Sequence, residues 1–323
     1  MKFAHAALLC ALSLALPAPL YSQTFPSRPI RVIAPFPPGG GATEIIIRLI
    51  APKMSEALGQ PILIENRSGA NGMIGTDLVA RAAPDGYTLL YASSSNLATN
   101  VYLSKNVPFD ALKDFTPISL AATPLTAFVV HASVPVNSIK EFLEYAKRNP
   151  GKLTYGSAGI GSMQHLTGEA LKRVTGIDIL HVPYKGAAPA INAIVAGQID
   201  IYFPGTSIIK PYLTSKKIKL LALLEPERYP GMPNVPTVAE TIPGFTKAPS
   251  WFAMFGPAGL ARPIVNRLNA ETIKALKQPD VHARFDETGI QAIGSTPEQL
   301  AEVLKNDIER SGTLIRALGI EPE

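Results

Sequence analysis

The sequence has almost no cysteine: among its 323 residues, Cys10 is the only one. Cys10 lies in the apolar run from Ala6 to Leu16, which follows Lys2 and precedes the turn-forming stretch PAPLYSQ. This layout is typical of a secretory signal peptide, which we predict over residues 1–22. The bulky Leu9 before Cys10 argues against a lipid-modified cysteine. A mature chain without cysteine excludes disulfides and thiol chemistry, and it suits an exported protein.

The sequence also lacks a long membrane-spanning run and a strong excess of charge. The apolar run near the N-terminus is too short to cross ~30 Å of hydrocarbon as a helix, so we expect no direct membrane insertion. Lys and Arg number 30 and Asp and Glu 25, which gives a net charge of +5. The densest basic cluster, TSKKIK at 214–219, has no interleaved aromatic residues. This composition favours a soluble protein with no nucleic-acid partner.

Motifs for nucleotides and metals are missing as well. The glycine-rich turn at 36–44 has neither the Gly-Lys-Ser/Thr of a phosphate-binding loop nor the Gly-x-Gly-x-x-Gly spacing of a dinucleotide site. The carboxylates are isolated and do not form an acid/base pair. The histidines that follow the signal are far apart and lack the paired spacing of metal ligands: His131, His165, His181 and His282. We therefore expect no metal and no cofactor.

Short apolar segments alternate with amphipathic ones, which predicts an α/β fold with parallel sheets. Ser138 with Glu141, and Thr296 with Gln299, have the spacing of helix capping boxes. Strands are expected at 31–36, 61–66, 87–93, 126–134, 179–186, 199–203, 219–225 and 250–259, and helices at 42–58, 76–83, 139–148 and 187–196.

Two glycine-rich strand-to-helix turns, at 36–44 and 156–165, predict two similar lobes that form a clamp. Ligands of open parallel sheets bind beyond the carboxyl ends of the strands, where both turns are expected to lie. Proline-rich stretches at 108–124 and 226–249 are the predicted crossovers. We therefore assign lobe 1 to residues 23–123 and 229–323, and lobe 2 to residues 124–228.

Each glycine-rich turn provides backbone N–H donors at the positive end of a helix dipole, a pattern typical of anion sites. The second turn, GSAGIGSMQH, adds the hydroxyls of Ser157 and Ser162, and His165 follows within one helical turn. A serine hydrolase that uses one of these serines with His165 as its base is an alternative. The Gly-x-Ser-x-Gly elbow is absent, however, and a helical histidine three residues after a serine does not readily face it. We therefore expect Ser162 to cap the helix.

Several motifs occur together and in a fixed order: APFPPGG, ENRSGANGMIGTDLVARAAPDGYTLLYA, YGSAGIGSMQHL, HVPYKGAAPA, VPTVAET and GSTPEQL. They span essentially the whole mature chain. In this combination the chain resembles the Bug-type extracytoplasmic solute receptors of the tripartite tricarboxylate transporter family. The resemblance implies a periplasmic, non-catalytic, two-lobed clamp of the type II periplasmic binding protein fold. It also implies a small carboxylate ligand, gripped between the two turns by backbone amides, hydroxyls and ordered water.

The resemblance also implies which residues contact the ligand. The first turn supplies Phe36, Pro38, Gly39, Gly40, Gly41 and Thr43. The second supplies Ser157, Ala158, Gly159, Gly161 and Ser162, with His165 behind them. Ser94, Asn96 and Tyr184, with Lys185 and Gly186, border the cleft.

The sequence departs from the family pattern in two places. The first turn has Glu44 where the family usually has Asp, and it fits the pattern only if one residue has been added upstream. The strand IDIYF is followed by Pro204 and Gly205, whereas family members often have an aspartate there that could pair with a ligand amine. We therefore expect a mono- or dicarboxylic acid without an amino group.

Two functions agree with this ligand chemistry. One is a monomeric receptor that delivers the carboxylate to membrane transporter subunits. The other is a subunit that presents the same ligand to a membrane sensor. The serine hydrolase is the third hypothesis, and it differs from both in that it predicts turnover of the ligand.

Overall fold

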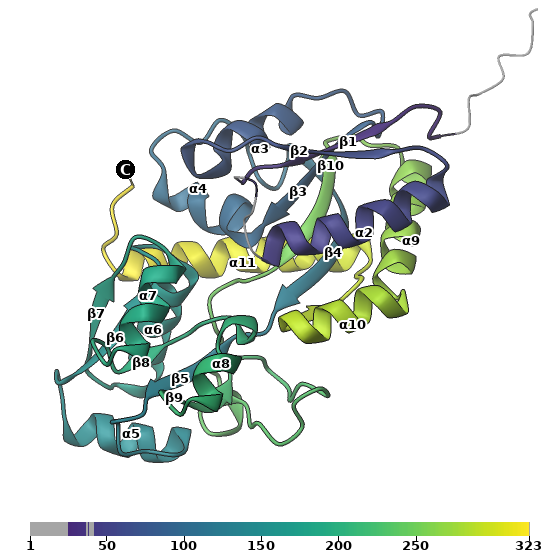
Figure 1. The fold of residues 1–323 in the computed structure, drawn as a ribbon. Helices are drawn as coiled ribbons and strands as arrows, with labels where there is room; N and C mark the ends of the chain where they lie inside the picture. Colours follow the sequence, from purple (N-terminus) through teal and green to yellow (C-terminus); the bar gives the residue numbers. More distant parts are fainter. Residues whose placement is uncertain (1–24, 37, 39–41, 323) are drawn as a thin grey trace, which may run out of the picture.

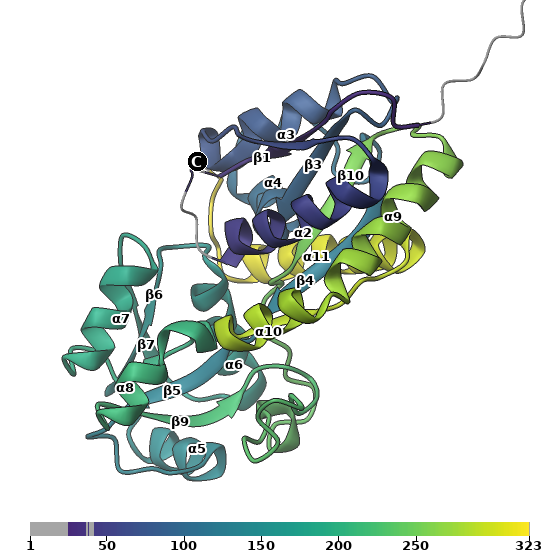
Figure 2. The same cartoon turned by 45° about the vertical axis from the view of Figure 1, so that its right-hand side comes forward.

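The computed structural model describes residues 25–36, 38 and 42–322. The predicted signal peptide therefore lies outside the described residues. Within them, no helix is both long and apolar enough to cross a membrane. The described chain forms two β-sheets, each with helices on both faces (Figures 1 and 2). We call the part built on the six-stranded sheet lobe 1, and the part built on the five-stranded sheet lobe 2.

Lobe 1 contains the strand order β11-β4-β10-β3-β1-β2. Strand β1 runs parallel to β2 and β3, whereas β10 runs antiparallel to β3 and β4, and β11 antiparallel to β4. The strands are β1 (Ile30–Ala34), β2 (Ile62–Asn66), β3 (Thr88–Ser93), β4 (Phe115–Pro124), β10 (Phe252–Pro257) and β11 (Ile290–Ala292). The helices are α2 (Ala42–Leu58), α3 (Met73–Ala80), α4 (Asn100–Leu103), α9 (Arg262–Leu276), α10 (Pro279–Thr288) and α11 (Pro297–Ala317), with short turns η1 (Ala70–Gly72) and η2 (Ser95–Thr99).

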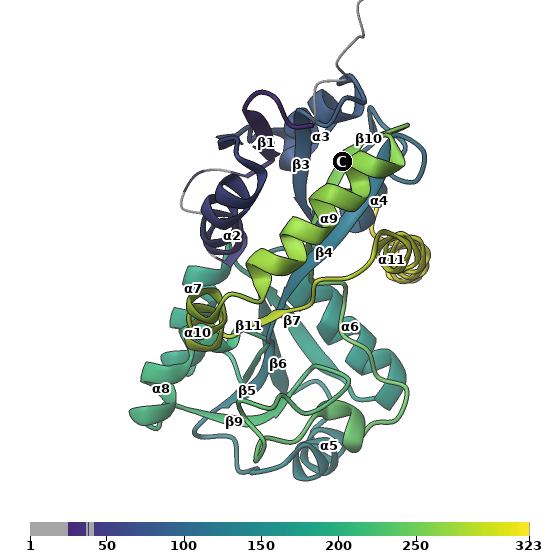
Figure 3. The ribbon, with the colours of Figure 1, turned by 90° about the vertical axis from the view of Figure 1, so that its right-hand side faces the viewer.

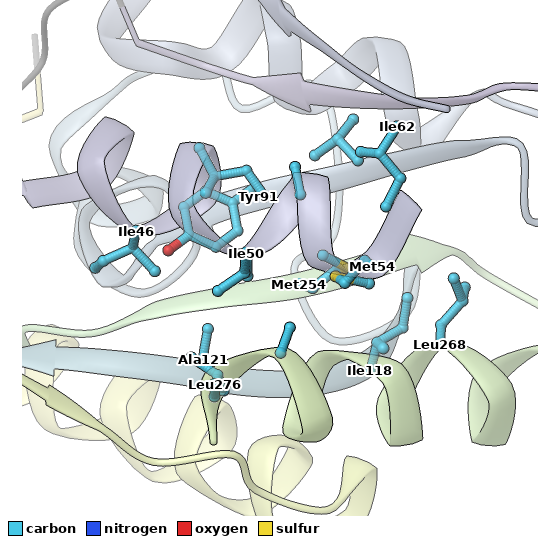
Figure 4. Packing of buried hydrophobic residues seen from close by; sticks show 14 of the residues in the cluster. Ile46, Ile50, Met54, Ile62, Tyr91, Ile118, Ala121, Met254, Leu268 and Leu276 are labelled. Atoms are coloured by element: carbon cyan, nitrogen blue, oxygen red, sulfur yellow. The ribbon is translucent and has the colours of Figure 1, made fainter. Parts of the chain in front are cut away.

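Alternating side chains of the central strands build two cores in lobe 1. Ile30 and Val32 of β1 pack into a cluster with α2, α9 and α10, whereas Ile33 packs into a cluster with α3 and α11. Figure 4 shows the first cluster, in which Met54 of α2, Met254 of β10 and Leu268 of α9 lie together. This two-sided burial is the physical reason that β1 is apolar at successive positions.

Lobe 2 contains the strand order β7-β6-β8-β5-β9, in which β6 is parallel to β7 and β8, and β5 is antiparallel to β8 and β9. The strands are β5 (Ala127–His131), β6 (Leu153–Ser157), β7 (Ile179–Pro183), β8 (Ile201–Tyr202) and β9 (Ile218–Leu223). The helices are α5 (Ile139–Arg148), α6 (Met163–Thr175), α7 (Ala187–Val195) and α8 (Lys210–Thr214), with the turn η3 (Thr206–Ile208); η4 (Val238–Glu240) lies in the connection that leaves β9.

The helix starts predicted at Ser138 and Thr296 are confirmed. Ser138 Oγ accepts the Glu141 N–H at the start of α5. Thr296 and Gln299 form the reciprocal capping box of α11. Helix α7 begins at Ala187, as predicted, while α3 begins at Met73, three residues before the predicted start. The α/β, two-lobed architecture is therefore as expected, and the lobe boundaries at 123/124 and 228/229 stay predictions.

Two expectations about the sheets were wrong. The sheets are mixed rather than parallel, because β10 and β11 run opposite to the other strands of lobe 1, and β5 runs opposite to the other strands of lobe 2. The stretch 108–124, predicted to be only a crossover, contains the ten-residue strand β4. Pro117 lies next to a register shift between β4 and β10, and a proline is tolerated at such an irregularity because no ladder hydrogen bond is needed there.

The chain passes between the lobes after β4 and again between β9 and β10. A buried ion pair within the second connection lies where the two meet: Lys247 Nζ is 2.6 Å from Glu225 Oε1. Lys247 also donates to Thr126 Oγ1 at 3.0 Å, and the Thr126 N–H donates to the same Glu225 oxygen. A buried charge without its partner is costly, so this pair fixes where the two connections meet.

Candidate ligand-binding cleft

A cleft of about 490 Å³ lies between the two lobes. Its lobe 1 wall comes from the carboxyl ends of β1, β2 and β3 and from the following turns, and its lobe 2 wall comes from the turn after β6. The described residues that line the cleft are Pro35, Phe36, Ser68, Gly69, Gly72, Ser93, Ser95, Asn96, Asn100 and Leu103 from lobe 1, and Ile160, Gly161 and Ser162 from lobe 2.

The loop between β2 and α3 gives the lobe 1 wall its shape. Gly72 has a φ of 89°, and its position leaves no space for a side chain. A Cβ placed there would lie 2.3 Å from Asn96 Nδ2 and 3.0 Å from the Pro35 carbonyl oxygen. Three segments that are distant in sequence therefore meet at Gly72, and glycine is required by both conformation and space.

Hydrogen bonds within lobe 1 orient two of the cleft residues. Asn96 Oδ1 accepts from the Ser93 N–H at 2.9 Å and from Ser93 Oγ at 2.8 Å, which turns the amide nitrogen of Asn96 toward Gly72. Asn66, at the end of β2, donates through Nδ2 to the Phe36 carbonyl oxygen at 3.2 Å. The turn after β1 is thus hydrogen-bonded to the end of β2, and the turn after β3 is held by its own hydrogen bonds next to Gly72.

The lobe 2 wall is a single tight turn before α6. Gly161 has a φ of 75°, and Ser162 Oγ accepts the His165 N–H as the N-cap of α6. A Cβ on Gly161 would lie 2.5 Å from Leu103 Cδ1, so this turn touches the opposite lobe. Ile160, 66% exposed, also lines the cleft. The predicted helix cap at Ser162 is confirmed.

Behind the lobe 2 wall, three aromatic rings form a stack. The ring of His165 lies 4.0 Å from that of His181, which in turn lies 4.9 Å from that of Tyr155. His165 Nδ1 accepts the Gly161 N–H at 3.0 Å, which requires an unprotonated Nδ1. The Ser157 hydroxyl donates to the Gly159 carbonyl oxygen, so it accepts from the His181 Nε2–H, with Nε2 2.6 Å from Oγ. The stack therefore fixes the position of Gly161 directly, through His165, and that of Gly159 through Ser157.

Burial keeps both imidazoles neutral. It lowers the pKa of His165, and the nearby Lys172 ammonium acts in the same direction while the Glu169 carboxylate opposes it. Burial also lowers the pKa of His181 to about 4, with a further contribution from the adjacent His165. The hydrogen bond from the Gly161 N–H requires the neutral ring of His165, because a doubly protonated imidazole has no acceptor nitrogen.

The described residues that line the cleft include no charged side chain. The available polar groups are backbone amides, serine hydroxyls and the side-chain amides of two asparagines. Helices α3 and α6 begin at the cleft, so the positive ends of their dipoles are directed at it. This arrangement can bind an anion through neutral donors, without a counter-ion.

The residues predicted to contact the ligand take different positions. Phe36, Asn96, Gly161 and Ser162 line the cleft, and Pro38 is exposed in the turn after β1. Gly39, Gly40, Gly41 and the side chain of Thr43 lie outside what the structure describes.

The remaining predicted residues support the walls instead of lining them. Ser94 is buried and its Oγ donates to the Pro249 carbonyl oxygen. Ser157 and His165 are buried behind the second turn, as described above. Ala158 accepts the Gly186 N–H, and the Tyr184 N–H donates to Ser157, so Gly159 and its neighbours are held against the end of β7.

Part of the lobe 1 wall was not predicted from the sequence, namely Ser68, Gly69, Gly72, Asn100 and Leu103, together with Pro35, Ser93 and Ser95. The first three belong to the segment SGANG, which directly follows a predicted strand and contains two glycines. That pattern could have indicated a third turn at the cleft. Asn100 and Leu103 carried no such signal, because α4 is short and was not predicted.

Groups of three or more metal-binding side chains are absent from the described ranges.

Comparison with known proteins identifies the family of this chain. Residues 46–320 match the family model described as "Tripartite tricarboxylate transporter family receptor". Protein BugT of Bordetella pertussis is 34% identical over 304 residues, which cover 94% of this chain and 93% of BugT.

Two solved structures that resemble this chain contain carboxylates. One is Rpa4515 of R. palustris with adipate, at 33% identity and a TM-score of 0.76, which covers 93% of this chain and 100% of that one. The other is MatC of Rhodopseudomonas palustris with bound malate, at 34% identity and a TM-score of 0.71, which covers 90% and 100%. This chain therefore has the two-lobed periplasmic binding protein fold, and it belongs to the receptor family of tripartite tricarboxylate transporters.

Proposed function

We propose that this protein is a periplasmic receptor that holds a small carboxylate between its lobes and delivers it to membrane transporter subunits. One observation carries the proposal: a cleft between the lobes is lined, in its described part, by neutral donors and by two helix N-termini. A carboxylate satisfies such donors, and each hydrogen bond to a charged group contributes about 1.5–3 kcal/mol net of water.

The two walls belong to different lobes, so the ligand stabilises the arrangement in which both contact it. Exclusion of water from the closed cleft then strengthens each hydrogen bond. A membrane partner can recognise the closed form as the occupied one. The signal peptide proposed over residues 1–22 accounts for export, and the mass of the mature protein purified from the periplasm tests the cleavage site.

The contact residues that we propose combine those predicted from sequence with those lining the cleft. Backbone amides of Gly39, Gly40, Gly41 and Ala158, and the side chains of Phe36, Pro38, Thr43, Ser68, Asn96, Asn100 and Ser162, form the site. The Gly159 and Gly161 N–H groups hold the second turn instead, because they donate to Ser157 Oγ and His165 Nδ1. Ser94, Ser157, His165 and Tyr184 act behind them as positioning residues, because their polar atoms are committed to the walls.

We further propose that the ligand is an acid without an amino group. The described cleft residues include no Asp or Glu that could pair with an ammonium group, and Pro204 and Gly205 follow β8. Relatives with adipate and with malate support an acid of this type. Calorimetry with malate, adipate and aspartate on the same preparation provides the test. We expect at least one of the first two acids to bind, and tighter binding of aspartate would contradict the proposal.

We propose that the protein binds its ligand without turnover. Ser157 is the serine closest to a histidine, but it is fully buried and its hydroxyl donates to the Gly159 carbonyl oxygen. The partner ring of His181 is stacked between Tyr155 and His165. A nucleophile must reach its substrate, and this hydroxyl does not line the cleft.

Substitution of Ser157 distinguishes ligand binding without turnover from serine hydrolase activity. We expect Ser157→Ala to lower the free energy of unfolding by about 1–3 kcal/mol, because His181 Nε2 and the Gly159 N–H lose their partner. Denaturant unfolding measures this change. Hydrolysis of 4-nitrophenyl acetate by the wild type that Ser157→Ala abolishes would instead support the hydrolase.

A further inference from the structure

A second cavity, of about 240 Å³, lies between the lobes at a different place from the ligand cleft. One side of it is helix α6 of lobe 2, and the other is helix α11 of lobe 1 together with residues 244–249 of the connection between the lobes. Figure 3 shows α6 below α11 on the same side of the molecule. The Ala248 N–H donates to Thr167 Oγ1, so the connection is fastened to α6 beside this cavity.

The walls of this cavity are largely apolar. Leu166, Ala170 and Val174 lie on one face of α6, at spacings of four residues, and Leu314 of α11 contributes a further apolar side chain. Val174 is 46% exposed, although apolar side chains of this size are usually buried. The cavity is smaller than the roughly 300–1,000 Å³ of typical ligand pockets, which limits an occupant to a small molecule.

The charged groups around the cavity carry an excess of one positive charge. Three cationic side chains line it: Arg173, Lys247 and Arg310. Lys247 is paired with Glu225, and Arg310 with Asp307. The ion pairs found among the described residues do not include Arg173, so three cations face two carboxylates.

A polar group in the wall also lacks a partner. Ser311 of α11 lines the cavity and is 1% exposed, and its Oγ has no hydrogen-bond partner among the described residues. A buried hydroxyl without a partner lowers stability, so the packing of α11 beside this cavity leaves one hydrogen-bond donor unsatisfied.

We propose that this cavity is a second binding site, for a monocarboxylate with a compact apolar body. The apolar faces of α6 and α11 hold the body, and the Arg173 guanidinium binds the carboxylate. This site differs from the cleft, whose described lining has no charged side chain. An occupant would contact both lobes, so it would favour the present arrangement of α6 and α11. The proposal does not depend on the function proposed for the cleft.

The probe for the test is 4-fluorobenzoate, titrated into the mature chain and followed by its ¹⁹F NMR signal. Ser68→Trp fills the cleft from an exposed loop position and removes any binding there, which calorimetry with malate verifies. In this background we expect Arg173→Gln to raise the Kd of 4-fluorobenzoate about tenfold, the loss of one charged hydrogen bond. We expect Ala170→Phe, which fills the cavity, to abolish binding.

Arg148→Gln is the matched control, because Arg148 is also exposed in the last helical turn of a lobe 2 helix but does not line the cavity. We expect it to leave the Kd unchanged. The neutral isostere 4-fluorobenzyl alcohol should bind much more weakly than the acid. Equal effects of the two arginine substitutions, or equal binding of the alcohol, would overturn the proposal. Arg173 is exposed, so its variant is expected to fold even if Ala170→Phe does not.

Discussion

The two walls of the cleft are built in different ways. The lobe 1 wall assembles turns that follow three neighbouring strands, and these meet at Gly72, where Pro35 and Asn96 leave no space for a side chain. The lobe 2 wall is one turn, Ile160 to Ser162, held from behind by neutral imidazoles. The lobe 1 wall depends on steric fit, and the lobe 2 wall depends on the protonation state of its imidazoles. Different perturbations should therefore disrupt the two walls.

Gly72→Ala should have the largest effect, and it tests the steric wall. The added Cβ would meet Asn96 Nδ2 at 2.3 Å, and alanine would have to adopt a φ of 89°. We expect the free energy of unfolding to fall by about 1–3 kcal/mol and the Kd of the cleft ligand to rise more than tenfold, because the wall must move. Denaturant unfolding and calorimetry with malate or adipate measure the two effects.

Gly59→Ala provides the control for backbone strain. Gly59 has a φ of 69°, but no atom lies within 4 Å of a Cβ placed there. We expect a loss of about 1 kcal/mol from the left-handed backbone and no change in Kd. If Gly72→Ala cost no more than Gly59→Ala and left binding intact, the steric account of the lobe 1 wall would be wrong.

Lowering the pH should have an intermediate effect on stability, and it tests the role of the imidazoles behind the lobe 2 wall. Because burial lowers the pKa of His181 to about 4, the unfolded chain binds protons more readily than the folded chain between pH 6.5 and 4. The stability that the neutral ring supplies is present above pH 6.5 and is lost as the pH falls toward 4. We expect the Tm to fall over this range.

His181→Gln should flatten this pH dependence, because it removes the titrating ring next to Ser157. His282→Gln is the control, since His282 is exposed on α10 and far from the stack in sequence. Parallel Tm-versus-pH curves for wild type and His181→Gln would mean that the imidazoles do not control the acid response of lobe 2.

The N-cap of α6 should have the smallest effect. Ser162→Ala removes a cap that is worth about 1 kcal/mol, and with it a hydroxyl that lines the cleft. Ser138→Ala removes the equivalent cap of α5, away from the cleft. We expect similar losses of stability, measured by denaturant unfolding, but a higher Kd only for Ser162→Ala. An equal Kd in both variants would show that the Ser162 hydroxyl does not contribute to binding.

The sequence predicted the second wall more completely than the first. GSAGIGS contains a strand end, three glycines and a helix cap within a few residues, so its local pattern was sufficient to place it. The first wall combines residues from Pro35 to Leu103, and α4 had no signal in the sequence. Strand β4 was missed for a related reason, because its prolines hid a strand that pairing with β10 and β11 stabilises.

By itself, the sequence determined the family, the α/β class and the glycine-rich turn before α6, because turns, caps and strand ends depend on residues close together in the chain. Only the tertiary structure decided which groups meet. The register of β6 against β7 places His181 opposite Tyr155, so that His181 rather than His165 contacts Ser157. The approach of the lobes likewise placed Arg173 beside α11. Such contacts depend on packing between distant segments, which no local pattern encodes.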